Sequence, residues 1–292
     1  MSEGIFDPEK KRQEFDKFIV KEYLRLGSID EVFRVHGYNL PISYAEAHRL
    51  VKRWGIIKAA GPNARLSEVL GFLTVLSQEK IPLERLYRQM PLSFKTSIST
   101  LHRVLTFVRK ETIRRVGTAL VISPEDDGNQ ILVGRDISTP RPELGKPYGS
   151  LSLPMGYSSR TESAKTSILR VLQQEVFSQN AISQNMPNVI PDYPKPFMYF
   201  DIVDVRVAVY HVILPKELSQ WEKFSSYKVA GHSFVSAYDL SQGNLQGLRM
   251  GIAEIGSGYV NYRRNLEVGP LRIPVIEKSH LNRDLALEYS YL

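Results

Sequence analysis

The sequence predicts a multidomain protein in which an all-α front region precedes an α+β rear domain. Two observations support this fold class. Apolar residues recur at helical spacing from about Phe15 to Arg115, with few strand-like runs. From Val116 onward, β-branched and aromatic runs alternate with Pro/Gly-rich loops. The 292 residues are enough for two domains, and the apolar fraction of 42% is typical of globular proteins.

The charge is distributed unevenly along the chain. Residues 1–115 contain 21 Lys+Arg and 13 Asp+Glu, a net charge of +8, whereas residues 116–292 contain 17 and 18, a net charge of −1. A basic excess confined to the front indicates a polyanionic partner for that region. The absence of cysteine excludes disulfides, thiolate zinc sites and cysteine nucleophiles. The charged start MSEGIFDPEKKRQEF is no secretory signal, so we expect a cytoplasmic protein without a membrane partner.

Residues 1–60 have the pattern of a helix-turn-helix unit. One apolar stripe ends at Gly27, and two S-x-x-E pairs then start a second and a third helix. The pairs are Ser28 with Glu31 and Ser43 with Glu46. The third helix of such a unit enters the major groove of double-stranded DNA. Its candidate DNA-binding residues are Ser43, Tyr44, His48, Arg49, Lys52 and Arg53.

Residues 61–115 repeat the outline as a second helical, helix-turn-helix-like unit. Its third helix begins near Ser93 and carries small hydroxyl and basic side chains that suit phosphate and base contacts. The candidates are Ser93, Lys95, Thr96, Ser97, Thr100, His102 and Arg103. The same pattern also fits a helical oligomerisation or partner-binding domain with a basic face, and this alternative stays open.

The rear domain, residues 116–292, mixes strands and helices. We expect a hairpin over Thr118–Arg135 around the turn EDDGN, and a short strand in SLSLPMG. A helix follows within residues 156–178. MYFDIVDVRVAVYHVILP predicts one or two strands, and HSFVSAYDL a further strand. In LQGLRMGIAEIG the spacing of apolar residues predicts a helix. The C-terminal 26 residues have no clear pattern.

The helix within residues 156–178 carries the most specific pattern in the chain. Gly156, five residues, Glu162, seven residues, Arg170, and then Leu172 and Glu175 resemble the Nudix box, G-x5-E-x7-R-E-U-x-E-E-x-G-U, where U is aliphatic. The order of strands around it is also similar to a Nudix domain over residues 116–265. The resemblance implies an α/β/α sandwich and a site for nucleoside diphosphate compounds.

The departures from the box concern its carboxylates. The family's Glu after the arginine is Val171 here, and the first of its paired Glu residues is Gln174, so only Glu175 remains. The closing glycine and the aliphatic residue after it are Phe177 and Ser178. Mg²⁺ prefers carboxylate oxygens, so we expect neither a metal site nor catalytic residues. An active enzyme would use Mg²⁺ with Glu175, Glu162 and Arg170.

An ordinary amphipathic helix explains part of the same pattern. Ser159 and Glu162 form another S-x-x-E pair, which by itself accounts for Glu162. Ile168 and Leu172 belong to an ordinary core stripe. Under this interpretation Arg170 and Glu175 are solvated surface charges.

The combined prediction is a DNA-binding transcription regulator with a catalytically degenerate Nudix-like domain that senses a nucleotide-type effector. It is similar in its parts to the Nudix-related regulators of NAD metabolism, which carry the DNA-binding unit after the Nudix domain, the reverse of the order here. The effector implied by the resemblance is a nucleoside diphosphate compound such as ADP-ribose. The candidate ligand-binding residues are Gly156, Tyr157, Arg170, Arg135 and Phe197.

Two other functions remain open. One is an active Nudix hydrolase that recruits metal ligands from elsewhere in the chain. The other is a helical adaptor that binds no nucleic acid. A homodimer is the ordinary expectation for helix-turn-helix proteins, although two units in one chain also suffice for two half-sites.

Overall fold

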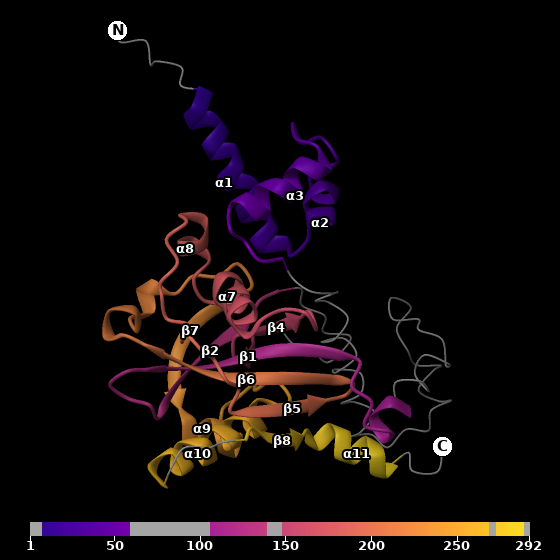
Figure 1. Cartoon of the computed structure of the whole chain (residues 1–292), viewed down its shortest axis with the longest axis vertical. Helices are drawn as coiled ribbons and strands as arrows, with labels where there is room; N and C mark the ends of the chain where they lie inside the picture. The colour runs from indigo at the N-terminus through magenta and orange to yellow at the C-terminus, as the bar shows by residue number, and fades with distance from the viewer. Residues whose placement is uncertain (1–7, 59–105, 139–147, 269–272, 289–292) are drawn as a thin grey trace.

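The computed structural model describes residues 8–58, 106–138, 148–268 and 273–288 (Figure 1). Its helices are α1 (Pro8–Leu26), α2 (Ile29–Val35), α3 (Tyr44–Arg53), α7 (Ala164–Glu175), α8 (Ser178–Ile182), α9 (Ala237–Gln242), α10 (Ile252–Val268) and α11 (His280–Glu288), with the short 3-10 helices η3 (Lys216–Leu218) and η4 (Trp221–Lys223). Its strands are β1 (Arg115–Pro124), β2 (Gln130–Asp136), β3 (Ser150–Ser152), β4 (Met155–Ser158), β5 (Met198–Ile202), β6 (Val205–Leu214), β7 (Val229–Ser236) and β8 (Val275–Lys278).

Two mixed or antiparallel sheets form the centre of the rear domain. The larger has the order β4-β1-β6-β5-β8, in which β1 and β6 are parallel and β4 is antiparallel to β1. The smaller has the order β3-β2-β7, with both pairings antiparallel. Helices α7 and α8 lie on one side of the sheets, and α9 and α10 lie on the other (Figure 1). This arrangement is the three-layer α/β/α sandwich expected from the resemblance.

Alternation along β1 explains why helices cover both faces. Leu120 and Ile122 pack into the core beneath α7, whereas Ala119 and Val121 pack into the core beneath α10. Successive side chains of a strand point to opposite faces, so an uninterrupted apolar strand must be covered on both sides. The apolar run TALVI therefore explains why β1 is a central, fully covered strand.

The expected hairpin over Thr118–Arg135 is wrong in its pairing. Both strands form and EDDGN lies between them, but β1 belongs to the five-stranded sheet and β2 to the three-stranded sheet. The partners of β1 are instead β4 and β6, the latter in a parallel ladder that runs from Arg115 to Pro124. Each strand satisfies its backbone groups with strands distant in sequence, which local turn signals do not encode.

The stretch MYFDIVDVRVAVYHVILP forms the two strands β5 and β6, which pair antiparallel around Val203 and Asp204. Val203 has a φ of 56°, in the left-handed region that β-branched residues rarely adopt. Asn282 of α11 holds it there, because its Oδ1 accepts from Val203 N at 2.6 Å and its Nδ2 donates to Val203 O at 3.1 Å. The C-terminal region thus closes this turn.

Two other expectations for the rear domain need correction. HSFVSAYDL is a strand only as far as Ser236, where β7 ends, and its last residues begin α9 at Ala237. Leu245 and Leu248 lie before α10, which begins only at Ile252, although both pack against the core. The unassigned C-terminal region contains β8, a strand at the end of the five-stranded sheet, where Val275 is 49% and Ile276 56% exposed. In the described part of the chain, no helix combines the length and hydrophobicity that crossing a bilayer requires.

The front unit consists of three helices around a small core, as predicted. Ser28 Oγ accepts from Glu31 N and Ser43 Oγ from Glu46 N, both at 3.1 Å, so both predicted caps are confirmed. The core residues from the three helices include Ile19, Val20, Leu24, Val32, Phe33, Leu50 and Val51. Residues 36–43 join α2 to α3. Helix-turn-helix character, and the division at residues 60 and 115, stay predictions.

The front unit packs on the α7–α8 side of the rear domain (Figure 1). Trp54 Nε1 donates to Ile182 O at 3.0 Å. The front core also includes Ala181, with Ile182 and Tyr227 packed against it, so one apolar cluster spans both parts.

Candidate functional site

Helix α7 begins later than its S-x-x-E pair suggests. The capping residue is Ser163, whose Oγ accepts from Thr166 N at 3.2 Å, so a helix start at Ser159 is wrong. Glu162 Oε2 does accept from Ser159 N at 3.2 Å, but within the loop that precedes the helix. The loop and the helix are joined by the interaction of Glu162 with Arg170.

Arg170 is buried, with a side chain only 2% exposed, so it is no solvated surface charge. Its Nε and Nη2 donate to the two oxygens of Glu162 at 3.1 and 3.0 Å, and Nη2 also donates to Ser158 Oγ at 2.9 Å. Gly156 permits this approach, because a Cβ there would lie 3.3 Å from Arg170 Nη1. Glu162 and Arg170 of the box thus form one buried bidentate ion pair beside Gly156, and this pair fixes the loop.

Positions 171, 174 and 175, which carry carboxylates in the helix of the box, have different environments here. Val171 is 2% exposed and belongs to the core beneath α7, with Leu120 and Leu132. Glu175 accepts from Met155 N at 2.8 Å. Although part of its side chain reaches the surface, protein surrounds the carboxylate, and this desolvation raises the pKa of Glu175 to about 7 against the opposing effects of Met155 N–H and Lys228.

The amide of Gln174 is bonded at both ends. Its Nε2 donates to Ile57 O at 3.1 Å, and its Oε1 accepts from Lys228 Nζ at 3.1 Å. Gln173 makes two further bonds to the same segment of the front unit. Its Oε1 accepts from Ile57 N at 3.0 Å, and its Nε2 donates to Gly55 O at 2.9 Å. The side chains of the last helical turn therefore hold the backbone that follows α3.

Lys228 lies buried beside the end of α7, with a residue exposure of 8%. Burial lowers its pKa, and the carboxylates of Glu175 and Asp136 oppose that effect. Arg249 forms a longer ion pair with Asp136, with its Nη1 3.8 Å from Asp136 Oδ2. The site thus combines two carboxylates with cationic side chains.

These residues do not fit the divalent metal that the box resemblance implies. Of the three helix positions 171, 174 and 175 that carry carboxylates in the box, only Glu175 keeps one, and Glu162, the remaining glutamate of the box, is held in the ion pair with Arg170. Gln174 is already bonded to Ile57 and Lys228. Among the described residues, no group of three or more His, Cys, Asp or Glu side chains is arranged to hold a metal ion.

The other predicted ligand-binding residues lie in different places. Tyr157 is 7% exposed and its hydroxyl accepts from Arg115 Nη1 at 3.1 Å. Phe197 is 6% exposed and stacks on Tyr262 with ring centroids 4.7 Å apart. Arg135 is exposed and donates to Gly149 O at 3.1 Å. Phe197 and Tyr262 line a second cavity, of about 290 Å³, and ligand binding at these positions stays a prediction.

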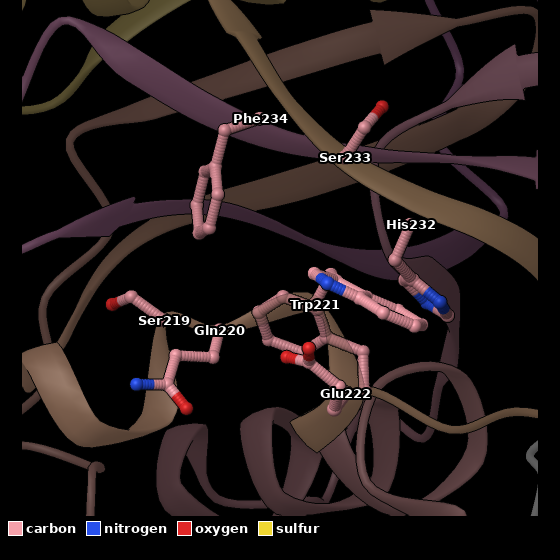
Figure 2. A pocket seen from close by; sticks show the side chains of 8 residues that line it. Ser219, Gln220, Trp221, Glu222, His232, Ser233 and Phe234 are labelled. Atoms are coloured by element: carbon pink, nitrogen blue, oxygen red, sulfur yellow. The ribbon is translucent and has the colours of Figure 1, made fainter.

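A cavity of about 660 Å³ adjoins the C-terminal end of α7 (Figure 2). Its lining residues are Ser219, Gln220, Trp221, Glu222, Phe224, His232, Ser233 and Phe234. Trp221 is 72% exposed, and His232 is tied to the helix, because its Nε2 lies 2.7 Å from Glu175 O. Burial lowers the pKa of His232. The cavity therefore offers aromatic surface and polar groups but no cationic side chain.

The described DNA-binding candidates lie on or at the start of α3. Arg49, Lys52 and Arg53 are exposed. Glu46 accepts from Arg49 Nη1 at 3.1 Å and from Arg53 Nη1 at 3.0 Å.

The other α3 candidates are engaged within the front unit. Ser43 caps the helix, Tyr44 Oη donates to Asp30 Oδ1 at 2.7 Å, and His48 Nδ1 lies 2.7 Å from Lys58 Nζ. The candidates of the second unit, from Ser93 to Arg103, lie outside the described residues.

Sequence reasoning missed Lys228, Asp136 and Gln173. Lys228 precedes a strand in a stretch without any box-like pattern, and Asp136 ends a strand whose partner lies far away in sequence. The adjacent glutamines at positions 173 and 174 were a possible signal, because an amide pair on a buried helix face needs hydrogen-bond partners.

No protein-family model matches this sequence, and no curated protein is similar to it. Solved structures with a similar fold include the MutT protein from Methanosarcina mazei Go1, a mutT/nudix family protein from Listeria innocua and a NUDIX hydrolase from Nitrosomonas europaea. Their identities to this chain are 16%, 15% and 10%, and the matches cover 54%, 54% and 57% of it and 98%, 98% and 81% of the other chains.

The TM-scores are 0.37, 0.38 and 0.39, and likenesses at this level carry no argument about activity. The rear domain is a three-layer sandwich in which a glycine-led loop is tied to the following helix by the Glu162–Arg170 ion pair, the arrangement that the resemblance to the Nudix box implies.

Proposed function

We propose that this chain is a DNA-binding regulator whose Nudix-like domain senses a nucleoside-diphosphate-type compound without hydrolysing it. The observation that carries the proposal is the amide of Gln174, which bonds Ile57 of the front unit and Lys228 where the box has a metal-binding glutamate. A domain that hydrolysed pyrophosphate in the family's way would need that position for a metal ligand. Here the same position connects two parts of the chain.

The basic front supports DNA as the partner. Arg49, Lys52 and Arg53 are exposed on the third helix, and the net charge of residues 1–115 is +8. Glu46 neutralises part of this charge, but exposed ion pairs are weak and exchange readily for phosphate contacts. Contacts of this kind position a protein on the duplex.

The residues that line the cavity beside α7 favour a ligand with an aromatic group. Trp221 and Phe234 face a volume of about 660 Å³, and Gln220 and Ser233 add hydrogen-bonding groups (Figure 2). A nucleobase is planar, uncharged and edged with donors and acceptors, which suits this lining. His232 connects the cavity wall to the last turn of α7, the turn that also holds the front unit. Ligand binding there would shift DNA affinity only through different affinities for two arrangements of this turn.

A hydrolysis assay tests the non-catalytic part of the proposal. The full chain is incubated with Mg²⁺ and a panel of ADP-ribose and related nucleoside diphosphate compounds, beside a Glu175→Gln variant. We expect neither protein to release nucleoside monophosphate above the protein-free rate. Mg²⁺-dependent release by the wild type that Glu175→Gln abolishes would establish a hydrolase instead.

A salt series tests the DNA-binding part. We expect the full chain to bind duplex DNA in fluorescence polarisation, with an affinity that falls steeply as salt rises because counterions are released. Replacing Arg49, Lys52 and Arg53 with Gln should lower the slope of log K against log salt by about 2 to 3, near 0.9 per lost phosphate contact. Lys195→Gln, an exposed change in the rear domain, is the matched control. Absence of binding at low salt would favour the adaptor.

A further inference from the structure

Lys228 occupies an unusual position for a lysine. Its side chain is buried at the junction of the last turn of α7 with the start of β7. Burying an ammonium group away from water is costly unless it is paired and hydrogen-bonded. A buried lysine therefore needs specific partners, and the structure supplies them.

The partners of Lys228 are the groups that would face a metal in the box. Its Nζ donates to Gln174 Oε1 at 3.1 Å, and the side chain at this position is the first of the paired glutamates in the family pattern. Glu175, the second of the pair, and Asp136 at the end of β2 favour its charged form electrostatically. The ammonium thus has one hydrogen bond to α7, and two carboxylates from two separate elements favour its charge.

The side chains around Lys228 do not form a site for a divalent metal ion beside its ammonium group. Val171 faces the apolar core beneath α7, and the other end of the Gln174 amide is bonded to Ile57 O. The Arg170 guanidinium is already committed to Glu162 and Ser158. A divalent ion at this point would meet one box carboxylate and an adjacent positive charge.

We propose that the Lys228 ammonium is a built-in cation, which takes the place of a divalent metal on this face of α7 and is held there by its hydrogen bond to Gln174. The domain is then independent of metal for its folding and for any ligand it binds. The change from Glu to Gln at position 174 fits this arrangement, because an amide accepts from Lys228 with its oxygen while its NH₂ group remains free to bind the front unit. A carboxylate has no donor for that second contact.

Exchanging the cation tests the proposal. The full-length wild type is compared with Lys228→Met and with the double variant Gln174→Glu/Lys228→Met, which restores paired carboxylates and removes the ammonium. Mn²⁺ binding is followed by loss of the free-ion electron paramagnetic resonance signal and by the thermal unfolding midpoint. We expect Mn²⁺ to leave the unfolding midpoint of the wild type unchanged. We expect the double variant to bind Mn²⁺ with a dissociation constant at least about tenfold lower than that of the wild type. Lys223→Met, an exposed lysine nearby, should behave as wild type.

A measurement on the wild-type protein tests the inference even where the variants fail to fold. A buried, hydrogen-bonded ammonium exchanges its protons slowly, so the Lys228 NH₃⁺ group should give a resolved nitrogen-15 signal coupled across the hydrogen bond to the Gln174 amide carbon. Mn²⁺ bound to wild-type Glu175, or no protected ammonium at this position, would overturn the inference. Hydrolysis through a metal held elsewhere would contradict the proposed function and leave the Lys228 result unchanged, so the two failures are distinguishable.

Discussion

Ionisation of the buried Glu175 carboxyl group lowers the stability of the folded state. Its pKa is about 7 in the folded chain and near 4.5 when unfolded, because burial disfavours the charge. The folded state therefore binds the proton more tightly than the unfolded state. The resulting stabilisation is fully present below pH 4.5 and is lost as the pH rises through 7.

We expect Glu175→Gln to remove this pH dependence. A glutamine carbonyl still accepts from Met155 N–H but cannot ionise. The free energy of unfolding of the variant, relative to wild type, should rise between pH 4.5 and 7 by on the order of 2–3 kcal/mol. Urea denaturation of both proteins across this range checks it. A difference that stays constant with pH would show that the carboxyl titrates normally.

Residues differ in how far their roles follow from the sequence. The caps Ser28 and Ser43 were predictable because a cap bonds a backbone N–H three residues away. Ser159 was misassigned because the loop before α7 contains several hydroxyl residues, and the one that caps is Ser163. Lys228 was not predictable, because its burial depends on β7 and α7 meeting 54 residues apart.

At the scale of elements, the last turn of α7 is a clamp for the segment after α3. Gln173, 3% exposed, bonds both Ile57 N and Gly55 O at the junction. Side-chain amides suit this role because they donate and accept at once. The position of the front unit thus depends on a few polar bonds and one apolar cluster.

We expect Gln173→Ala to loosen the front unit. Loss of the two bonds should reduce stability by about 1–2 kcal/mol and should speed amide hydrogen exchange at Ile57. Gln246→Ala, at an exposed position in the rear domain, is the control and should change neither. Unchanged exchange at Ile57 would mean that the apolar cluster alone holds the junction.

The elements of the rear domain were largely predictable in kind and only partly in pairing. Apolar runs and turn residues indicate β1, β2, β5 and β6, since strand and turn preferences are local. Which strands become neighbours is decided by the two cores, as the separation of β1 from β2 into different sheets illustrates. The start of α10 also depends on packing, because Leu245 and Leu248 meet the same core from the preceding loop.

At the scale of the whole molecule, the front and rear parts share a core cluster that includes Leu50, Val51 and Ala181. A shared apolar core makes the unfolding of one part costly for the other. The chain has two tryptophans, of which Trp54 lies at the junction and Trp221 is 72% exposed. Trp221→Phe therefore leaves a single fluorophore that reports on the junction.

We expect the Trp54 fluorescence of this variant to change in the same denaturant transition as the far-ultraviolet circular dichroism. Coincident curves are the sign of one cooperative unit. A Trp54 transition at lower denaturant would mean that the front unit detaches before the sandwich unfolds. Trp54→Phe in the same background serves to subtract signals from tyrosine.

The open flank of β8 has a consequence for handling the protein in solution. Among the described residues β8 is the outermost strand, with Val275 and Ile276 half-exposed, and a free strand edge next to aliphatic surface favours strand-to-strand association between molecules. Sedimentation velocity should therefore reveal concentration-dependent self-association, and Ile276→Lys should suppress it by placing like charges at the contact.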